Sequence, residues 1–318
     1  MALLQCIKLV GTMSSKNWMI PSPIQHKATA AAHTLCCAVV YLSEGRNNDL
    51  LDSLASVSAG RDAALIRQFR DPTYHRTGFT IGGSPGGVTR AVLEVSRHAL
   101  QVIDLRLHEA SHPRVGVVDH ISIHPLGVDP GATVDTCRAG HRIAEILGRE
   151  GLPVLLYGDL NDGRRLAKVR GSTPYFLSGN VPDEVDADVG PRKAGDVDPA
   201  KGISTIGCTP LVTNYNILLD TKTKSLAAAV TRSVREKDGG LPWVEALTLM
   251  RKDGRYETAC NLLRPKETTR AMVLAAAELG AARVGVSILD KYTTSLTEEE
   301  AVQATTLMLS NKDSSVET

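Results

Sequence analysis

Alternating stretches of apolar and polar positions divide the first half of the chain into short strands and amphipathic helices. Strands are expected at 36–43, 63–69, 75–82, 115–123 and 153–157, and helices at 47–59, 88–107 and 131–150. The Asp71-Pro72 pair is a turn signal between the second and third strands. So short a connection predicts that these two strands form an antiparallel hairpin.

The second half repeats this pattern of strands and helices. Strands are expected at 203–208, 211–219, 243–250, 256–262 and 283–289, and helices at 224–237, 267–280 and 297–310. The stretch 179–202 is rich in Gly, Pro and Asp and has no periodicity, which indicates a long loop or a linker. The pattern predicts an α+β protein of two α/β subdomains, 35–202 and 203–318, each a mixed or antiparallel sheet backed by helices.

Composition narrows the range of functions. A length of 318 residues is enough for two domains, each with its own core. A net charge of +1 and only 4% aromatic residues argue against nucleic-acid binding. No apolar run approaches the roughly 20 residues that span a bilayer, and the six scattered cysteines favour reduced thiols. We expect a cytoplasmic protein with small-molecule substrates and neither a nucleic-acid nor a membrane partner.

Residues 1–34 differ from the rest because they hold three lysines and no acidic residue. An organellar transit peptide is one interpretation of this composition. The segment has no arginine and poor helical amphipathicity, so we interpret it as an unstructured N-terminal extension.

The richest candidate chemistry lies between Ser111 and Pro125, which holds three of the nine histidines. His112 follows the predicted helix and precedes the predicted strand, so it falls on a loop, where it can reach a substrate as a general base. Arg114 is suited to holding a carboxylate through two hydrogen bonds. Asp119 either orients an imidazole or caps a turn.

The same region also suggests a metal site, because four histidines form two pairs at i, i+4. A metal-dependent hydrolase would use His108, His112, His120 and Asp119. Pro113 separates the first pair from one continuous helix, and His120 and His124 belong to a strand and its end. We therefore expect no metal.

Asn214 and Asn216 interrupt an apolar strand in the second half. Asparagine is depleted in strands, and alternate positions share one face of a sheet. Two interpretations stay open: a cross-strand hydrogen-bonded pair, or polar groups that point into a groove between the subdomains.

Several motifs in order resemble the formiminotransferase domain of folate metabolism, including its plant homologues. They are the strand ending in Ser43-Glu44-Gly45-Arg46-Asn47, then Ser111-His112-Pro113-Arg114-Val115-Gly116 with Asp119, Pro153 to Gly158, Asp188-Val189-Gly190-Pro191, and Thr213-Asn214-Tyr215-Asn216-Ile217. The resemblance covers most of 36–311. It implies ferredoxin-like N- and C-terminal subdomains and a plant-type homologue without the cyclodeaminase domain.

The resemblance also implies an activity: transfer of a formimino group from N-formimino-L-glutamate to tetrahydrofolate, a co-substrate bound between the subdomains. It makes His112 the catalytic base. It implies substrate or cofactor binding by Arg76, Arg114, Asp119, Gly190, Pro191, Gly202, Asn214 and Asn216. A homodimer is one assembly that we consider.

Three departures from the family pattern bear on the substrate. The segment Asp71 to Arg76 keeps the family's arginine but loses most of its other residues, the folate loop is stretched at 192–198, and the last strand lacks the usual pattern. The alternative function is therefore a non-catalytic folate-binding or interaction protein that keeps the fold and the groove.

Overall fold

The structure is a computed structural model that describes residues 34–57, 62–110, 112–127, 130–171 and 185–314. The expected N-terminal extension, apart from Thr34, and the expected loop before residue 185 lie outside these residues. No helix in the described ranges combines the length and the apolar content needed to cross a membrane.

The first sheet has six strands in the order β2-β3-β1-β4-β6-β5. Their bounds are β1 Leu35–Leu42, β2 Ala63–Asp71, β3 Arg76–Gly83, β4 Val118–Leu126, β5 Val154–Gly158 and β6 Ser204–Cys208. β1, β2, β3 and β4 pair antiparallel, whereas β6 runs parallel to both β4 and β5. The sheet is therefore mixed, and the predicted antiparallel hairpin of β2 and β3 is confirmed.

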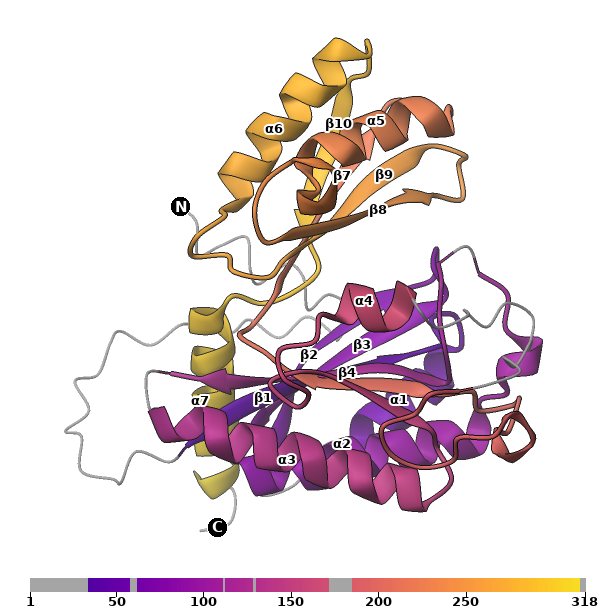
Figure 1. The fold of residues 1–318 in the computed structure, drawn as a ribbon. Coiled ribbons are helices and arrows are strands. Elements are labelled where there is room, and N and C mark those ends of the chain that lie inside the picture. Colours follow the sequence, from indigo (N-terminus) through magenta and orange to yellow (C-terminus); the bar gives the residue numbers. More distant parts are fainter. Residues whose placement is uncertain (1–33, 58–61, 111, 128–129, 172–184, 315–318) are drawn as a thin grey trace, which may run out of the picture. The chain divides into compact units, whose positions relative to one another are not determined.

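Helices pack on both faces of this sheet. On one face, α1 (Asn48–Val57), α2 (Pro85–Val102) and α3 (Pro130–Arg149) bury a large apolar core (Figure 1). α2 begins where Ser84 caps it and accepts a hydrogen bond from the Gly87 N–H. A smaller cluster that includes Cys37 and Ala301 joins α7 (Glu298–Ser314) to the other face.

The second sheet has four antiparallel strands in the order β10-β7-β9-β8. Their bounds are β7 Thr213–Leu219, β8 Val244–Met250, β9 Tyr256–Leu262 and β10 Ile288–Thr293, and the helices that back one face are α5 Lys224–Val234 and α6 Arg270–Arg283 (Figure 1). The chain passes through them in the order β-α-β-β-α-β. The two predicted sheets backed by helices are thus confirmed.

Several expected bounds need correction. The helix expected at 88–107 begins earlier, at Pro85, and ends at Val102, after which a 3₁₀ turn covers Leu105–Leu107. The strand expected at 283–289 is β10, Ile288–Thr293, because α6 continues to Arg283 and Gly285 follows with a φ of 66°. That left-handed conformation favours glycine and ends the helix.

The sequence patterns did not predict the short helices. α4 (Leu166–Gly171) has six residues, too few for a helical period to stand out. Two further 3₁₀ turns cover Ala194–Asp196 and Glu236–Asp238.

The expected division at 202/203 does not separate the two sheets. It assigns β6 and α7 to the second half, whereas β6 lies between β4 and β5 in the first sheet and α7 packs against β2, β3 and β4. The sheet boundary therefore follows Cys208, because β6 finds its partners by parallel pairing across a long connection. How the chain divides into folding domains stays a prediction.

Each sheet leaves one polar face. Side chains alternate along a strand, so the residues next to the buried Ile121 and Ile123 of β4 point away from the main core. They are His120, Ser122 and His124. Asn214 and Asn216 of β7 likewise alternate with the buried core residues Tyr215, Ile217 and Leu219.

Candidate functional site

His112 lies on the loop before β4, as predicted, and its imidazole is held at both nitrogens. Nδ1 lies 2.7 Å from the Pro113 carbonyl oxygen, and Nε2 lies 2.9 Å from a guanidinium nitrogen of Arg76. A carbonyl only accepts and a guanidinium only donates, so the proton belongs on Nδ1 and the lone pair on Nε2. This is the tautomer that a general base acting through Nε2 requires.

The surroundings of His112 keep it neutral. Burial, followed by the adjacent Arg76, lowers its pKa well below the usual value of 6.5. The ring also lies against Tyr74, with 5.7 Å between the ring centroids. At neutral pH the imidazole therefore carries its lone pair and no charge.

Arg114 is buried and is used as a clamp between two loops. Its guanidinium donates to the carbonyl oxygens of Tyr74, His75 and His112, at 3.0, 3.3 and 3.0 Å. The first two carbonyls belong to the turn that leads into Arg76, so the clamp places Arg76 beside His112. Direct contact between Arg114 and a substrate carboxylate stays a prediction.

Asp119 caps a turn, one of its two expected roles. Its carboxylate accepts from the Val115 N–H at 2.6 Å and pairs with Arg170 of α4 at 2.9 Å. Burial opposes its ionisation, but Arg170 and these hydrogen bonds outweigh burial and lower its pKa to about 2. Sequence reasoning missed Arg170, and no local signal identifies it because α4 itself was not predicted.

The net charge around His112 is positive. Arg76, Arg114 and Arg170 all act on this region, and Asp119 is the acidic group among them. Burial lowers the pKa of Arg114 to about 10, which still leaves it cationic at neutral pH. The Nε of Arg76 is buried and has no hydrogen-bond partner in the described part of the chain. The cluster is therefore suited to an anionic ligand.

The histidines proposed for a metal do not converge. His120 shares a 2.6 Å hydrogen bond with the Tyr157 hydroxyl, and His124 binds the Thr209 carbonyl and Ser122. Among the described residues, the one group whose ligand atoms lie within 4.8 Å of one another is Cys137, Asp159 and Cys208, which contains no histidine. The histidine cluster of a metal-dependent hydrolase is thus not assembled in this structure.

Tyr41 connects the His112 cluster to the second sheet. Its ring lies under the Arg76 guanidinium, 5.2 Å from centroid to carbon, and its hydroxyl donates to the Asn214 side-chain oxygen at 3.4 Å. Asn214 and Arg76, two predicted site residues from different sheets, are thereby brought together. Sequence reasoning missed Tyr41, because its position opposite His120 follows from the register of β1 with β4.

Asn216 belongs to a buried polar network on the second sheet. Its amide donates to Glu257 at 2.9 Å, and Glu257 also binds Arg251 and the Tyr292 hydroxyl. Asn214 similarly donates to Asn261, at 2.6 Å. The cross-strand interpretation of the two asparagines is therefore correct, and their substrate contacts stay predictions.

The glycine motifs have structural roles in the described residues. Gly190 has a φ of 88°, and a Cβ there would lie 2.6 Å from the Leu152 oxygen. Gly202 pairs with Gly116, two residues after Arg114, and a Cβ there would lie 2.5 Å from the Val115 oxygen. Gly202 thus supports the His112 loop. No hydrogen bond or ion pair among the described residues links Gly190 or Pro191 to that loop. Ligand contacts by these residues stay predictions.

Fold and site together define an α+β protein with a buried, neutral histidine in cationic surroundings. The family model for the formiminotransferase domain, N-terminal subdomain, matches residues 35–209. This chain is 30% identical to the formiminotransferase cyclodeaminase-like protein of Arabidopsis thaliana over 295 residues, which cover 87% of this chain and 98% of that one. The chain belongs to the formiminotransferase domain family.

Two other relatives have more specific names. Glutamate formimidoyltransferase of Thermoplasma acidophilum is 28% identical over 274 residues, covering 83% of this chain and 88% of that one. Formimidoyltransferase-cyclodeaminase of Sus scrofa is 29% identical over 238 residues, which cover 70% of this chain and 41% of that protein. The family is therefore of transferase type and related to formimino transfer.

Proposed function

We propose that this protein transfers a formimino group from N-formimino-L-glutamate to tetrahydrofolate, with His112 as the general base. The observation that carries the proposal is the neutral imidazole of His112, whose Nε2 lone pair faces Arg76 within a group of three arginines. A donor with two carboxylates is the class of substrate that such surroundings attract. The family's named relatives support the choice of donor.

The proton transfers follow from the state of His112. N5 of tetrahydrofolate attacks the formimino carbon, and Nε2 removes the proton that N5 must lose. The resulting imidazolium lies beside Arg76, and like charges favour giving the proton away. The glutamate nitrogen receives it as the carbon–nitrogen bond breaks, so glutamate leaves and His112 returns to its neutral form.

Arg76 has to move for this to happen. In the structure it donates to the same Nε2 that must accept the proton. A substrate carboxylate or pteridine oxygen would draw the guanidinium away, and its unpartnered Nε gives it a free donor for that contact. Substrate binding would therefore expose the base.

This contact also favours a second candidate, a folate-binding protein without turnover. If Arg76 keeps its hydrogen bond when ligands bind, Nε2 has no free lone pair and the groove binds without catalysis. The departures at 71–76 affect the very turn that carries Arg76.

The remaining expectations form part of the proposal. They are ferredoxin-like subdomains, which the β-α-β-β-α-β order of the second sheet supports, tetrahydrofolate as co-substrate, a cytoplasmic location and assembly as a homodimer.

The test combines calorimetric titration with 5-formyltetrahydrofolate and turnover of formiminoglutamate with tetrahydrofolate. We expect His112→Ala to abolish turnover and to keep folate binding, because a loop histidine contributes little to core packing. His141→Ala, at an exposed position of α3, is the matched control and should retain both. Binding without turnover in the unmodified protein would support the second candidate. Turnover that survives in His112→Ala would exclude His112 as the base.

A further inference from the structure

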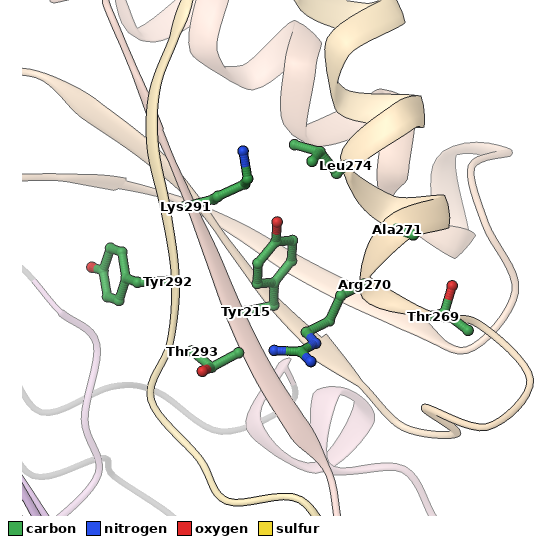
Figure 2. A pocket seen from close by; sticks show the side chains of 8 residues that line it. All are labelled: Tyr215, Thr269, Arg270, Ala271, Leu274, Lys291, Tyr292 and Thr293. Atoms are coloured by element: carbon green, nitrogen blue, oxygen red, sulfur yellow. The ribbon is translucent and has the colours of Figure 1, made fainter. Parts of the chain in front are cut away.

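A pocket lies away from His112, between the start of α6 and the edge strand β10. Its volume is about 530 Å³, within the range of small-molecule sites. Tyr215, Arg270, Leu274 and Lys291 lie around it (Figure 2). No carboxylate is among the residues that line it.

Three polar side chains around the pocket lack partners within the described residues. Arg270 and Lys291 are exposed, and neither side chain forms an ion pair or a hydrogen bond there. Tyr215 is only 6% exposed, yet its hydroxyl has no partner in the described chain and points into the pocket (Figure 2). The hydroxyl itself is not a buried atom, so it is open to the pocket and can donate to a ligand there.

The strand register places this pocket on the opposite side of the second sheet from Asn214 and Asn216. Tyr215 alternates with the two asparagines along β7, and Thr293 is paired with Tyr215 in β10. Tyr292 is paired with Asn216, and its hydroxyl binds Glu257. Figure 2 accordingly shows the Tyr292 ring on the other side of β10 from Lys291. The pocket therefore lies on the opposite face of the second sheet from Asn214, which contacts Tyr41 beside the His112 cluster.

The helix adds to the positive potential of the pocket. Arg270 is the first residue of α6, and Thr269 caps the helix by accepting from the Met272 N–H. The first N–H groups of a helix have no intrahelical acceptor and favour negative charge. Leu274, one turn further on, offers an apolar wall.

We propose that this pocket binds an oxyanion, a phosphate monoester or a carboxylate, carried on a small molecule with an apolar body. Arg270, Lys291 and the Tyr215 hydroxyl hold the oxygens, and the apolar body lies on Leu274. Two cations, one hydroxyl donor and the absence of an acidic group from the lining match an anion better than a neutral or cationic ligand. This proposal does not depend on the transferase activity, because it concerns only the binding of an anion at the pocket.

The test is direct titration of the full chain, by calorimetry or ligand-observed NMR. Phenyl phosphate, benzoate and phenol share an aromatic body and differ in charge. We expect at least one of the two anions to bind with a dissociation constant below the order of 10 mM, and phenol not to bind. The anion that binds more tightly identifies the natural oxyanion. Equal binding of phenol, or no binding by either anion, would overturn the proposal.

Variants assign the binding to the pocket. Arg270→Gln with Lys291→Gln should weaken anion binding by about tenfold or more, and Tyr215→Phe by severalfold, because charge-assisted hydrogen bonds are lost. Tyr215→Phe keeps the buried ring and thus the core. The control is Lys224→Gln, which changes an exposed cation at the first position of α5. An equal loss in the control, or no loss in the pocket variants, would refute the site.

Discussion

At the scale of single residues, the guanidinium of Arg76 affects the pKa of the proposed base, His112. Arg76 donates to Nε2 of His112 at 2.9 Å, and after burial it is the next cause of the low His112 pKa. The same residue is thus both a candidate substrate ligand and the group that keeps the base neutral. Proton affinity at His112 should therefore respond to any change at Arg76.

Arg76→Gln should raise the pKa of His112, since the adjacent positive charge disappears while burial remains. The acid limb of kcat/KM should move to higher pH and stay below pH 6.5. Titration of the His112 ring by NMR in the ligand-free protein measures the same shift even if turnover is lost. Arg90→Gln, an exposed arginine on α2, should leave the titration unchanged. A His112 pKa that falls or stays constant in Arg76→Gln would contradict this account.

The sequence identified some of these residues and missed others for a physical reason. His112 belongs to a short motif whose residue types suggest proton transfer, and Arg76 was identified by the resemblance to the family, as the arginine kept in a segment that departs from the family pattern. Tyr41 reaches Asn214, and Arg170 reaches Asp119, through contacts between distant parts of the chain. Such contacts depend on strand register and helix placement, which a local pattern does not contain.

At the scale of elements, the site depends on how two loops are joined. The turn between β2 and β3 carries Tyr74 and His75 and leads into Arg76, the first residue of β3, and the segment before β4 carries His112. The planar guanidinium of Arg114 satisfies carbonyl oxygens from both segments. A flexible ammonium group lacks that fork geometry.

Arg114→Lys should therefore loosen the site although the charge is retained. We expect a loss of about 1–3 kcal/mol in the free energy of unfolding for a buried carbonyl left without its donor. Turnover should fall as Arg76 and His112 lose their alignment. Urea unfolding and turnover measure the two effects. Arg106→Lys, at an exposed arginine paired with Asp104, should leave the free energy of unfolding nearly unchanged, because a surface ion pair contributes little to stability. Equal stability changes in the two variants would argue against the clamp.

Most elements follow from periodicity, and the exceptions are informative. Long helices such as α3 and α5, and the hairpin of β8 and β9, lie close to their expected positions. β10 was displaced because Val284, Gly285 and Val286 read as strand residues, whereas Gly285 adopts a left-handed turn. β6 was expected with the second half but pairs with β4 and β5 of the first sheet, because parallel pairing joins segments far apart in sequence.

At the scale of the whole molecule, several histidines are held neutral by burial. Burial lowers the pKa of His108 and of His120 to about 3, and that of His124 to about 4. In the unfolded chain these histidines take up protons near pH 6.5. In the folded protein they stay neutral until pH 3–4. The contribution of these neutral histidines to the free energy of unfolding is thus fully present above pH 6.5 and declines as pH falls below it.

The free energy of unfolding should therefore decrease between pH 7.5 and pH 5, by about 2 kcal/mol for each such histidine. Few carboxylates titrate in this window, so urea unfolding at several pH values isolates the effect. His108→Phe keeps the ring contact with His75 and should remove the contribution of one histidine, about 2 kcal/mol, from the pH dependence. His141→Ala should leave it unchanged. Stability independent of pH in this range would show that these histidines are accessible to protons.

The placement of α7 has a consequence for the order of folding. Ala301 of α7 covers Cys37 on the face of the first sheet opposite α2, yet the ribosome makes α7 only after the whole second sheet. That face stays uncovered during synthesis of some ninety residues between Cys208 and Glu298. The nascent chain would thus carry an incomplete first sheet with the Cys37 thiol on its uncovered face, which makes the accessibility of Cys37 a natural reporter of when folding is completed.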